Sequence, residues 1–121
     1  MSIASWIGVA LLGGAGTLLR FRLDSFVQQR AGGDFPLGTL TVNVLGSFCL
    51  GLMVGASVGD TPLVLVGTGL LGSFTTFSTW MLETERSAEE GDGGLAVVNV
   101  VGPLVCGLGA AGIGWALGAL L

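Results

Sequence analysis

Long apolar stretches without charge alternate with short polar segments along the chain. Residues 1–19, 35–59, 61–82 and 93–121 contain no Asp, Glu, Lys or Arg. A helix needs about 20 mostly apolar residues to cross the hydrocarbon core of a bilayer, and each stretch has about that length. The pattern predicts an all-α membrane protein with four transmembrane helices, in which residues 1–121 form a single domain surrounded by membrane lipid.

Turn and cap residues indicate where these helices begin and end. The four helices are expected over Ile3 to about Gln29, Pro36 to about Val58, Pro62 to about Arg86, and Leu95 to Leu120. Thr61 is expected to cap the third helix, with Pro62 at its first position, where the missing N–H costs little. The intervening loops are too short for anything but antiparallel neighbours.

Positive charge is confined to one side of this arrangement. Antiparallel neighbours bring the ends of the first and third helices to the same side as the starts of the second and fourth. All four arginines fall there: Arg20, Arg22, Arg30 and Arg86. The positive-inside rule then places this side in the cytoplasm, with both termini outside the plasma membrane.

The composition agrees with a membrane protein and narrows its function. The chain has 23 glycines, and small residues let membrane helices approach closely. Glycines at four-residue spacing predict close helix contacts, within one chain or between subunits: Gly51, Gly55 and Gly59, then Gly114 and Gly118. The absence of His and of any nucleophile–base constellation within the spans argues against an enzyme. No basic patch suggests nucleic acid as a partner.

Polar side chains follow one face of the second helix. Thr39, Asn43 and Ser47 recur every four residues, which stacks them along that face. Asn43 carries a carboxamide near the middle of the span. Two interpretations of Asn43 remain open: an interhelical hydrogen bond that holds the bundle together, or a donor that lines a polar path.

A polar segment also interrupts the third helix near mid-membrane, from Gly72 to Trp80, with the sequence GSFTTFSTW. Its glycine, threonines and serines make a poor helix interior, because hydroxyls compete for backbone hydrogen bonds. We expect the helix to break here. Such irregular backbone is tolerated at bilayer depth only when it is buried in protein, lines water or holds an ion. The alternative is an unbroken helix whose hydroxyls donate to carbonyls four residues back.

Beyond the expected break, aromatic and acidic side chains share one face. Phe77 and Trp80 could present positively polarised ring edges to an anion, or could serve in ordinary packing and interfacial anchoring. Glu83, one turn later, either handles ions or is solvated. The candidate anion path comprises Thr39, Asn43, Phe77, Ser78, Thr79, Trp80 and Glu83. Because no charged group lies at mid-membrane, this set favours weak binding of a small anion in a channel over a pump.

Two motifs resemble those of the Fluc (CrcB) fluoride-channel family. They are GTLTVNVLG over residues 38–46 and GSFTTFST over residues 72–79, and the likeness extends over essentially the whole chain. Gly13, Gly16 and Arg20 also resemble the family's glycine-rich first helix, which ends in an arginine of structural role.

The resemblance implies a passive, fluoride-selective channel that exports fluoride and so reduces its toxicity. It implies an antiparallel dimer with two pores, and a structural Na⁺ held by backbone carbonyls of Gly72 and Thr75 from each subunit. Asn43 and Phe77 match pore positions, Trp80 stands where the family has a second phenylalanine, and Glu83 matches a glutamate.

This chain departs from the family pattern at several positions. Trp80 replaces a phenylalanine, Ser73 replaces the second glycine of a Gly-Gly pair, and the fourth helix has no hydroxyl between Val97 and Leu121. The dimer can be a homodimer or a heterodimer with a paralogue, and the arginine bias predicts one fixed orientation, which favours an oppositely oriented paralogue. The alternative function is therefore a non-conducting or half-active subunit of a heterodimeric channel. A small multidrug transporter would need a carboxylate within residues 1–19, and there is none.

Overall fold

The computed structural model describes all 121 residues, and every regular element in it is a helix. In chain order the elements are α1 (Ile3–Ala31), α2 (Leu37–Gly55), α3 (Asp60–Pro62), η1 (Leu63–Leu71), α4 (Gly72–Phe74), α5 (Ser78–Glu89) and α6 (Gly93–Gly118). The elements from α3 to α5 together form the third of four helices that are long and apolar enough to cross a membrane. The predicted four-span, all-α architecture is confirmed, and the chain is a multi-pass membrane protein.

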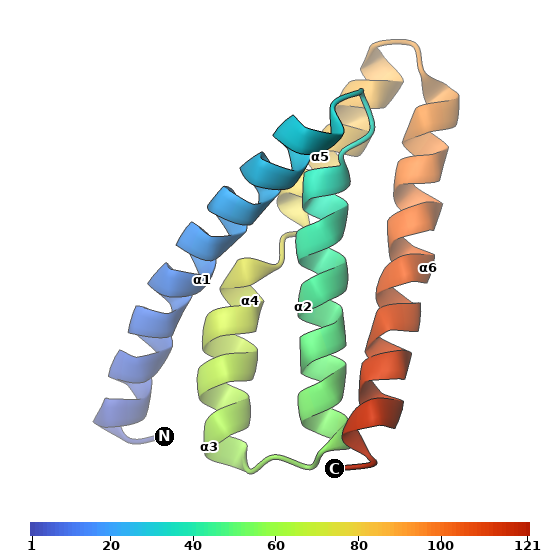
Figure 1. Cartoon of the computed structure of the whole chain (residues 1–121). Helices are drawn as coiled ribbons and strands as arrows, with labels where there is room; N and C mark the ends of the chain where they lie inside the picture. The colour runs from blue at the N-terminus through green and yellow to red at the C-terminus, as the bar shows by residue number, and fades with distance from the viewer.

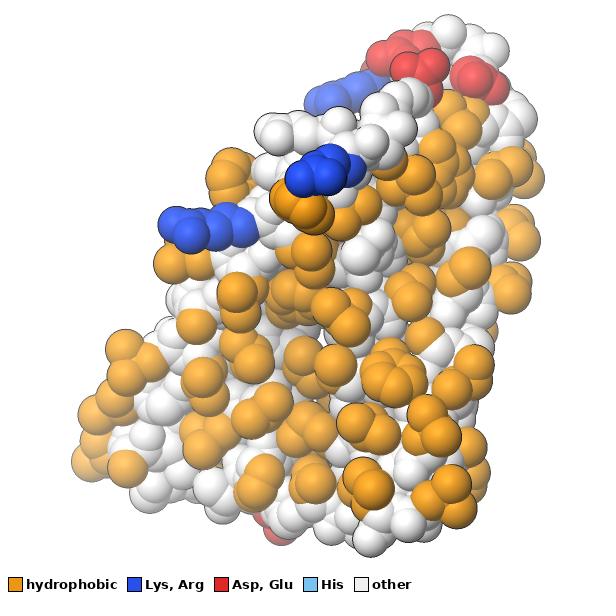
Figure 2. All heavy atoms as spheres, in the orientation of Figure 1, with side chains coloured by type: hydrophobic (Ala, Val, Ile, Leu, Met, Phe, Trp, Pro, Cys, Tyr) orange, Lys and Arg blue, Asp and Glu red, His pale blue; other side chains and the backbone are white.

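The four spans run up and down, and both chain ends lie at the same end of the bundle (Figure 1). Arginines and acidic side chains gather at the opposite end, and broad apolar flanks lie between the two ends (Figure 2). Only 16 of the 121 residues are buried, while 27 large apolar side chains are exposed. Such a surface suits a hydrocarbon solvent rather than water.

Glycines let the backbones of α2 and α6 meet along the most extensive helix contact in the chain. A Cβ on Gly51 or Gly55 would collide with the α6 backbone, and one on Gly114 or Gly118 with the α2 backbone. These four glycines therefore pack two helices of one chain. Gly59 does not join them, because it lies in the loop beside Pro62.

The helix ends differ from expectation at three points. The N-cap position of α3 is Gly59, without a side-chain cap bond, so the expected Thr61 cap is wrong. The second helix stops at Gly55, before the expected Val58. Two residues later Ser57 has a left-handed backbone, with a φ of 54°. The fourth begins at Gly93 rather than Leu95, because the Asp92 carboxylate accepts a hydrogen bond of 3.0 Å from the Leu95 N–H.

Candidate functional site

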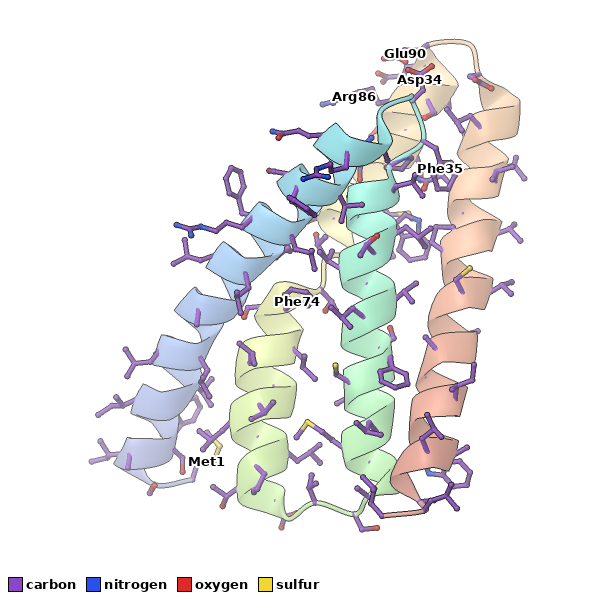
Figure 3. All side chains as sticks on the ribbon, viewed as in Figure 1. Met1, Asp34, Phe35, Phe74, Arg86 and Glu90 are labelled. Carbon is purple, nitrogen blue, oxygen red and sulfur yellow. The ribbon has the colours of Figure 1, made fainter.

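The third helix breaks where the polar segment predicts it. Helix α4 ends at Phe74, Thr75 is extended with φ −85° and ψ 160°, and α5 resumes at Ser78. Phe74 lies about midway between Met1 and Arg86 along the bundle (Figure 3). The unbroken-helix alternative is wrong, although the Thr75 hydroxyl does donate to the Leu71 carbonyl four residues back, at 3.0 Å.

Two carbonyls at the break lose their usual helical partners. The Thr76 N–H, four residues after Gly72, donates instead to the Asn43 side chain. The Thr79 N–H, four residues after Thr75, donates to the Thr76 hydroxyl at 3.2 Å. Neither the Gly72 nor the Thr75 carbonyl receives a replacement N–H from the surrounding loop. Both oxygens are therefore available to another electropositive partner.

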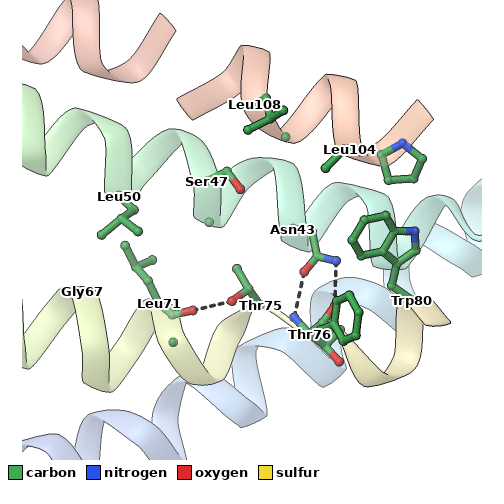
Figure 4. A pocket seen from close by; sticks show the side chains of 15 residues that line it. Asn43, Ser47, Leu50, Gly67, Leu71, Thr75, Thr76, Trp80, Leu104 and Leu108 are labelled. Atoms are coloured by element: carbon green, nitrogen blue, oxygen red, sulfur yellow. Dashed lines mark hydrogen bonds between the residues drawn. The ribbon is translucent and has the colours of Figure 1, made fainter. Parts of the chain in front are cut away.

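Asn43 of α2 holds the break in place. Its amide donates to the Thr76 carbonyl and accepts from the Thr76 N–H, each at 2.8 Å (Figure 4). The interhelical hydrogen bond expected as one interpretation of Asn43 is thus present. Because an amide has two N–H bonds and only one is used here, the second stays free. The same residue lines the cavity described below, so the two interpretations are compatible.

The hydroxyls after the break cluster around Thr76. Its oxygen lies 3.1 Å from the Thr79 hydroxyl and 3.4 Å from that of Ser78. Thr76 also accepts from the Thr79 N–H and so satisfies one amide in the first turn of α5, whose N-cap position is Phe77. Ser78 is exposed, and Thr79 is half-buried.

Arg20 reaches the break from α1. Its Nε donates to the Ser73 carbonyl at 3.3 Å. The structural role expected for Arg20 therefore has a geometric basis, since it supplies a donor to a backbone carbonyl beside the irregular segment.

Phe77 and Trp80 form an edge-to-face pair. Their ring centroids are 5.7 Å apart, with an interplanar angle of 88°. Phe77 is 69% exposed, so its ring is free to face a partner or an ion. The Trp80 indole N–H donates to the Asn99 carbonyl of α6. This bond ties the half-buried Trp80 into the bundle, which does not suit the interfacial-anchor alternative.

Asn99 is a residue of this site that the motifs missed. It is only 1% exposed, and its amide donates to the Thr84 hydroxyl at 2.8 Å. The sequence signal for Asn99 was its carboxamide, a polar group within the charge-free fourth span. Its partners could not be read from the sequence, because they lie 15 and 19 positions away.

Replacing Trp80 with phenylalanine is expected to destabilise the protein by about 1 kcal/mol, because the Asn99 carbonyl loses its donor. Thermal unfolding in detergent, monitored by circular dichroism, measures the change. Trp115→Phe is the matched control, since Trp115 is exposed on α6 and makes no side-chain hydrogen bond. Equal effects of the two substitutions would contradict the anchoring of Trp80.

Thr39 and Glu83 meet further toward the arginine-rich end. The Thr39 hydroxyl donates to Glu83 Oε1 at 2.5 Å, and Thr39 is buried. Glu83 is half-buried, and its carboxylate accepts from a side chain of the bundle. Thr39, Asn43 and Ser47 indeed share one face of α2, because the first two bond to the third span and Ser47 borders the cavity.

A cavity of about 360 Å³ opens beside the break, between α2, α6 and the third span (Figure 4). Its polar groups come from Asn43, Ser47, Thr75 and Thr76. The Phe77 and Trp80 rings border it as well, and its far part is lined by leucines. No charged side chain lines it. The cavity therefore offers amide N–H groups, hydroxyls and ring edges to a small guest.

Fold and site together define a multi-pass membrane protein with an uncharged polar cavity beside a broken helix. Residues 7–115 match the profile of the family described as "CrcB-like protein, Camphor Resistance (CrcB)". The chain thus belongs to the CrcB family, and the resemblance seen in its motifs is confirmed.

Curated relatives support this membership over most of the chain. A protein of Mycolicibacterium paratuberculosis named "Fluoride-specific ion channel FluC 2" is 47% identical over 120 residues, covering 99% of this chain and 98% of the relative. A Mycobacterium tuberculosis protein of the same name is 46% identical, with 94% and 90% covered. "Fluoride-specific ion channel FluC 1" of Rubrobacter xylanophilus is 50% identical, with 88% and 86% covered.

Proposed function

We propose that this protein is a fluoride-selective channel that lets fluoride leave the cytoplasm passively and so reduces its toxicity. The observation that carries the proposal is the uncharged cavity at the break, where Asn43 keeps an N–H free. The names of the relatives identify fluoride as the ion. Donors of this kind hold a small anion without trapping it, as conduction requires.

A passive channel suits this cavity better than a pump. A proton-coupled transporter keeps an ionisable group at membrane depth, whereas the lining here has none. Fluoride would pass the Asn43 amide and the ring edges of Phe77 and Trp80, whose hydrogens carry partial positive charge. It would then follow the Ser78 and Thr79 hydroxyls towards Thr39 and Glu83.

The free carbonyls at the break support a structural sodium ion. Unwound backbone carbonyls coordinate Na⁺ in broken membrane helices, and those of Gly72 and Thr75 have lost their N–H partners. Gly72 is also exposed, so its carbonyl can be shared with a second subunit. When bound, the ion would be coordinated by these oxygens and would join two chains in an antiparallel dimer.

The orientation of the chain in the membrane would follow from the position of its arginines. The arginine-rich end in Figure 2 would face the cytoplasm, and both termini would lie outside. With one fixed orientation, an antiparallel dimer needs an oppositely inserted paralogue. A homodimer instead needs insertion both ways.

A second candidate function is that of a half-active or non-conducting subunit in such a heterodimer. The observation that favours it is the α6 wall of the cavity, which presents Pro103, Leu104, Gly107 and Leu108 and no hydroxyl. An anion beside this wall would find no donor on α6.

Fluoride efflux from liposomes tests both candidates. Purified protein is reconstituted alone, and external fluoride and chloride are followed with ion-selective electrodes. A channel releases fluoride rapidly and retains chloride, whereas a partner-dependent subunit releases neither until a paralogue is added. Fluoride and chloride efflux at equal rates would contradict a fluoride-selective channel.

A further inference from the structure

One glutamine side chain joins the end of α1 to the start of α2. Gln28 is half-buried in the last turn of α1, just before the loop whose Asp34 and Phe35 are labelled in Figure 3. Its Nε2 donates to the Phe35 carbonyl and its Oε1 accepts from the Gly38 N–H, each at 3.1 Å. These two backbone groups lie on either side of Pro36, so Gln28 bridges the turn into α2.

The first turn of α2 has no cap of its own. Its N-cap position is Pro36, which makes no side-chain hydrogen bond because the proline ring carries no polar side-chain atom. The Gly38 N–H has no backbone acceptor either, so the Gln28 carboxamide is its only partner. The first amides of a helix normally take a side-chain acceptor from the N-cap residue. Here that acceptor comes from the preceding helix.

The carboxamide of Gln28 supplies both contacts at once. The Phe35 carbonyl can only accept and the Gly38 N–H can only donate, so the bridging side chain must offer one donor and one acceptor. An ionised carboxylate offers acceptors only, an ammonium group offers donors only, and an aliphatic side chain offers neither. Gln29, the next residue of α1, is exposed and makes no side-chain hydrogen bond. The bridge therefore belongs to Gln28 alone.

Packing places Gly38 directly against α1 without fixing it along the helix axis. Gly38 is buried, and a Cβ on it would overlap the carboxylate and the backbone carbonyl of Asp24. Such van der Waals contact sets how close the two helices lie, whereas hydrogen bonds are directional and also set the position along the axis. The loop adds little restraint, because Gly32 and Gly33 have φ values of 63° and 75° and glycine is conformationally permissive. Gln28 is thus the contact that fixes where α2 begins.

The residue after Gly38 belongs to the proposed anion path. Thr39 is only 2% exposed, and its hydroxyl donates to Glu83 Oε1 of α5. We propose that Gln28 is a positioning residue, which holds the first turn of α2 so that the Thr39 hydroxyl meets the Glu83 carboxylate. Gln28 does not line the cavity and acts on the anion path only through Thr39. The consequence for fluoride rests on the proposed function, whereas the positioning of Thr39 does not.

Hydrogen–deuterium exchange of the amides of residues 37–40, in detergent and with mass spectrometry, tests the bridge itself. In Gln28→Leu, which keeps a side chain of similar size without polar atoms, we expect exchange about tenfold faster than in the wild type, a change of about 1.4 kcal/mol in the opening equilibrium. Gln28→Glu keeps an acceptor for the Gly38 N–H and should exchange at an intermediate rate. Gln29→Leu is the matched control and should exchange as the wild type does. Equal exchange in Gln28→Leu and Gln29→Leu would overturn the proposal.

A double-mutant cycle tests whether Gln28 acts through Thr39. Fluoride efflux from liposomes is measured for Gln28→Leu, for Thr39→Val and for the double variant. We expect Gln28→Leu to lower the rate about fivefold in the wild type and to have no further effect in Thr39→Val, where the hydroxyl that it positions is already gone. A merely structural cap would lower both rates by the same factor, and that additive result would contradict the proposal.

Two further arrangements keep the cycle decisive. If Gln28→Leu does not fold, Gln28→Glu takes its place, with the same expectation of no further effect in Thr39→Val. If Thr39→Val conducts too slowly to measure, the cycle is run on the unfolding temperature, where additive shifts would again contradict the proposal. A wild-type protein that does not conduct fluoride would refute the proposed function, while the exchange result and the unfolding cycle would still decide the role of Gln28.

Discussion

Replacing Asn43 with alanine is expected to lower fluoride efflux by roughly 100-fold or more, since two part-buried backbone groups that hold the break lose partners at about 1–3 kcal/mol each. The groups are the Thr76 N–H and carbonyl, both bonded to the Asn43 amide at 2.8 Å. The substitution also removes the free amide N–H that borders the cavity. Liposome efflux measured with a fluoride electrode gives the rate.

A second variant tests the amide in the anion path. Asn43→Asp keeps an oxygen that can accept from the Thr76 N–H but has no donor for the Thr76 carbonyl, so one of the two bonds should survive. Its negative charge in the cavity should nevertheless repel an anion. We therefore expect Asn43→Asp to unfold below the wild-type temperature, because the Thr76 carbonyl loses its donor, and to conduct as poorly as Asn43→Ala. Wild-type efflux in Asn43→Asp would show that the amide does not line the anion path.

Gly114→Ala is expected to destabilise the protein by about 1–3 kcal/mol, because an added methyl group overpacks the contact between α6 and α2. A Cβ there would collide with the Phe48 carbonyl, which is backbone and cannot rotate away. The helices would have to separate along their most extensive contact. Thermal unfolding in detergent measures the loss.

The matched control lies two residues earlier in the same helix. A Cβ on Gly112 meets nothing within 4 Å, so Gly112→Ala should leave stability unchanged or raise it by less than about 1 kcal/mol through helix propensity. The comparison cancels the intrinsic preference of alanine for helix. If both substitutions destabilise equally, the glycines of α6 do not act through the α2 contact.

The local composition of the chain was enough to predict the four spans and the break. Charge-free stretches of about 20 residues specify membrane helices because the bilayer selects on length and hydropathy alone. The segment GSFTTFSTW predicted the interruption because its hydroxyls and glycine disfavour a helix interior. Both properties belong to consecutive residues, so no knowledge of partners was needed.

The partners of the polar residues were decided by tertiary structure. Asn43 and Thr76 are 33 positions apart, and Trp80 and Asn99 are 19 apart, so their pairing depends on how the spans pack. The same holds for the glycines, whose spacing agreed equally with contacts between subunits. Only the close approach of α2 and α6 showed that they act within one chain.

The π-helical element η1, Leu63–Leu71, shows most clearly what the sequence could not predict. Its residues, LVLVGTGLL, have the hydropathy of any membrane helix, so nothing in their pattern separates a spacing of five from one of four. In the structure Gly69 packs against Val9 of α1, and Gly16 of α1 packs against the Leu70 carbonyl. Both contacts depend on which side of the third span faces α1. The sequence alone thus determined that the third span is interrupted. Arg20 of α1 and Asn43 of α2 pair with backbone groups of Ser73 and Thr76 at the break, and only the packing of the spans decided this, because both side chains come from other helices.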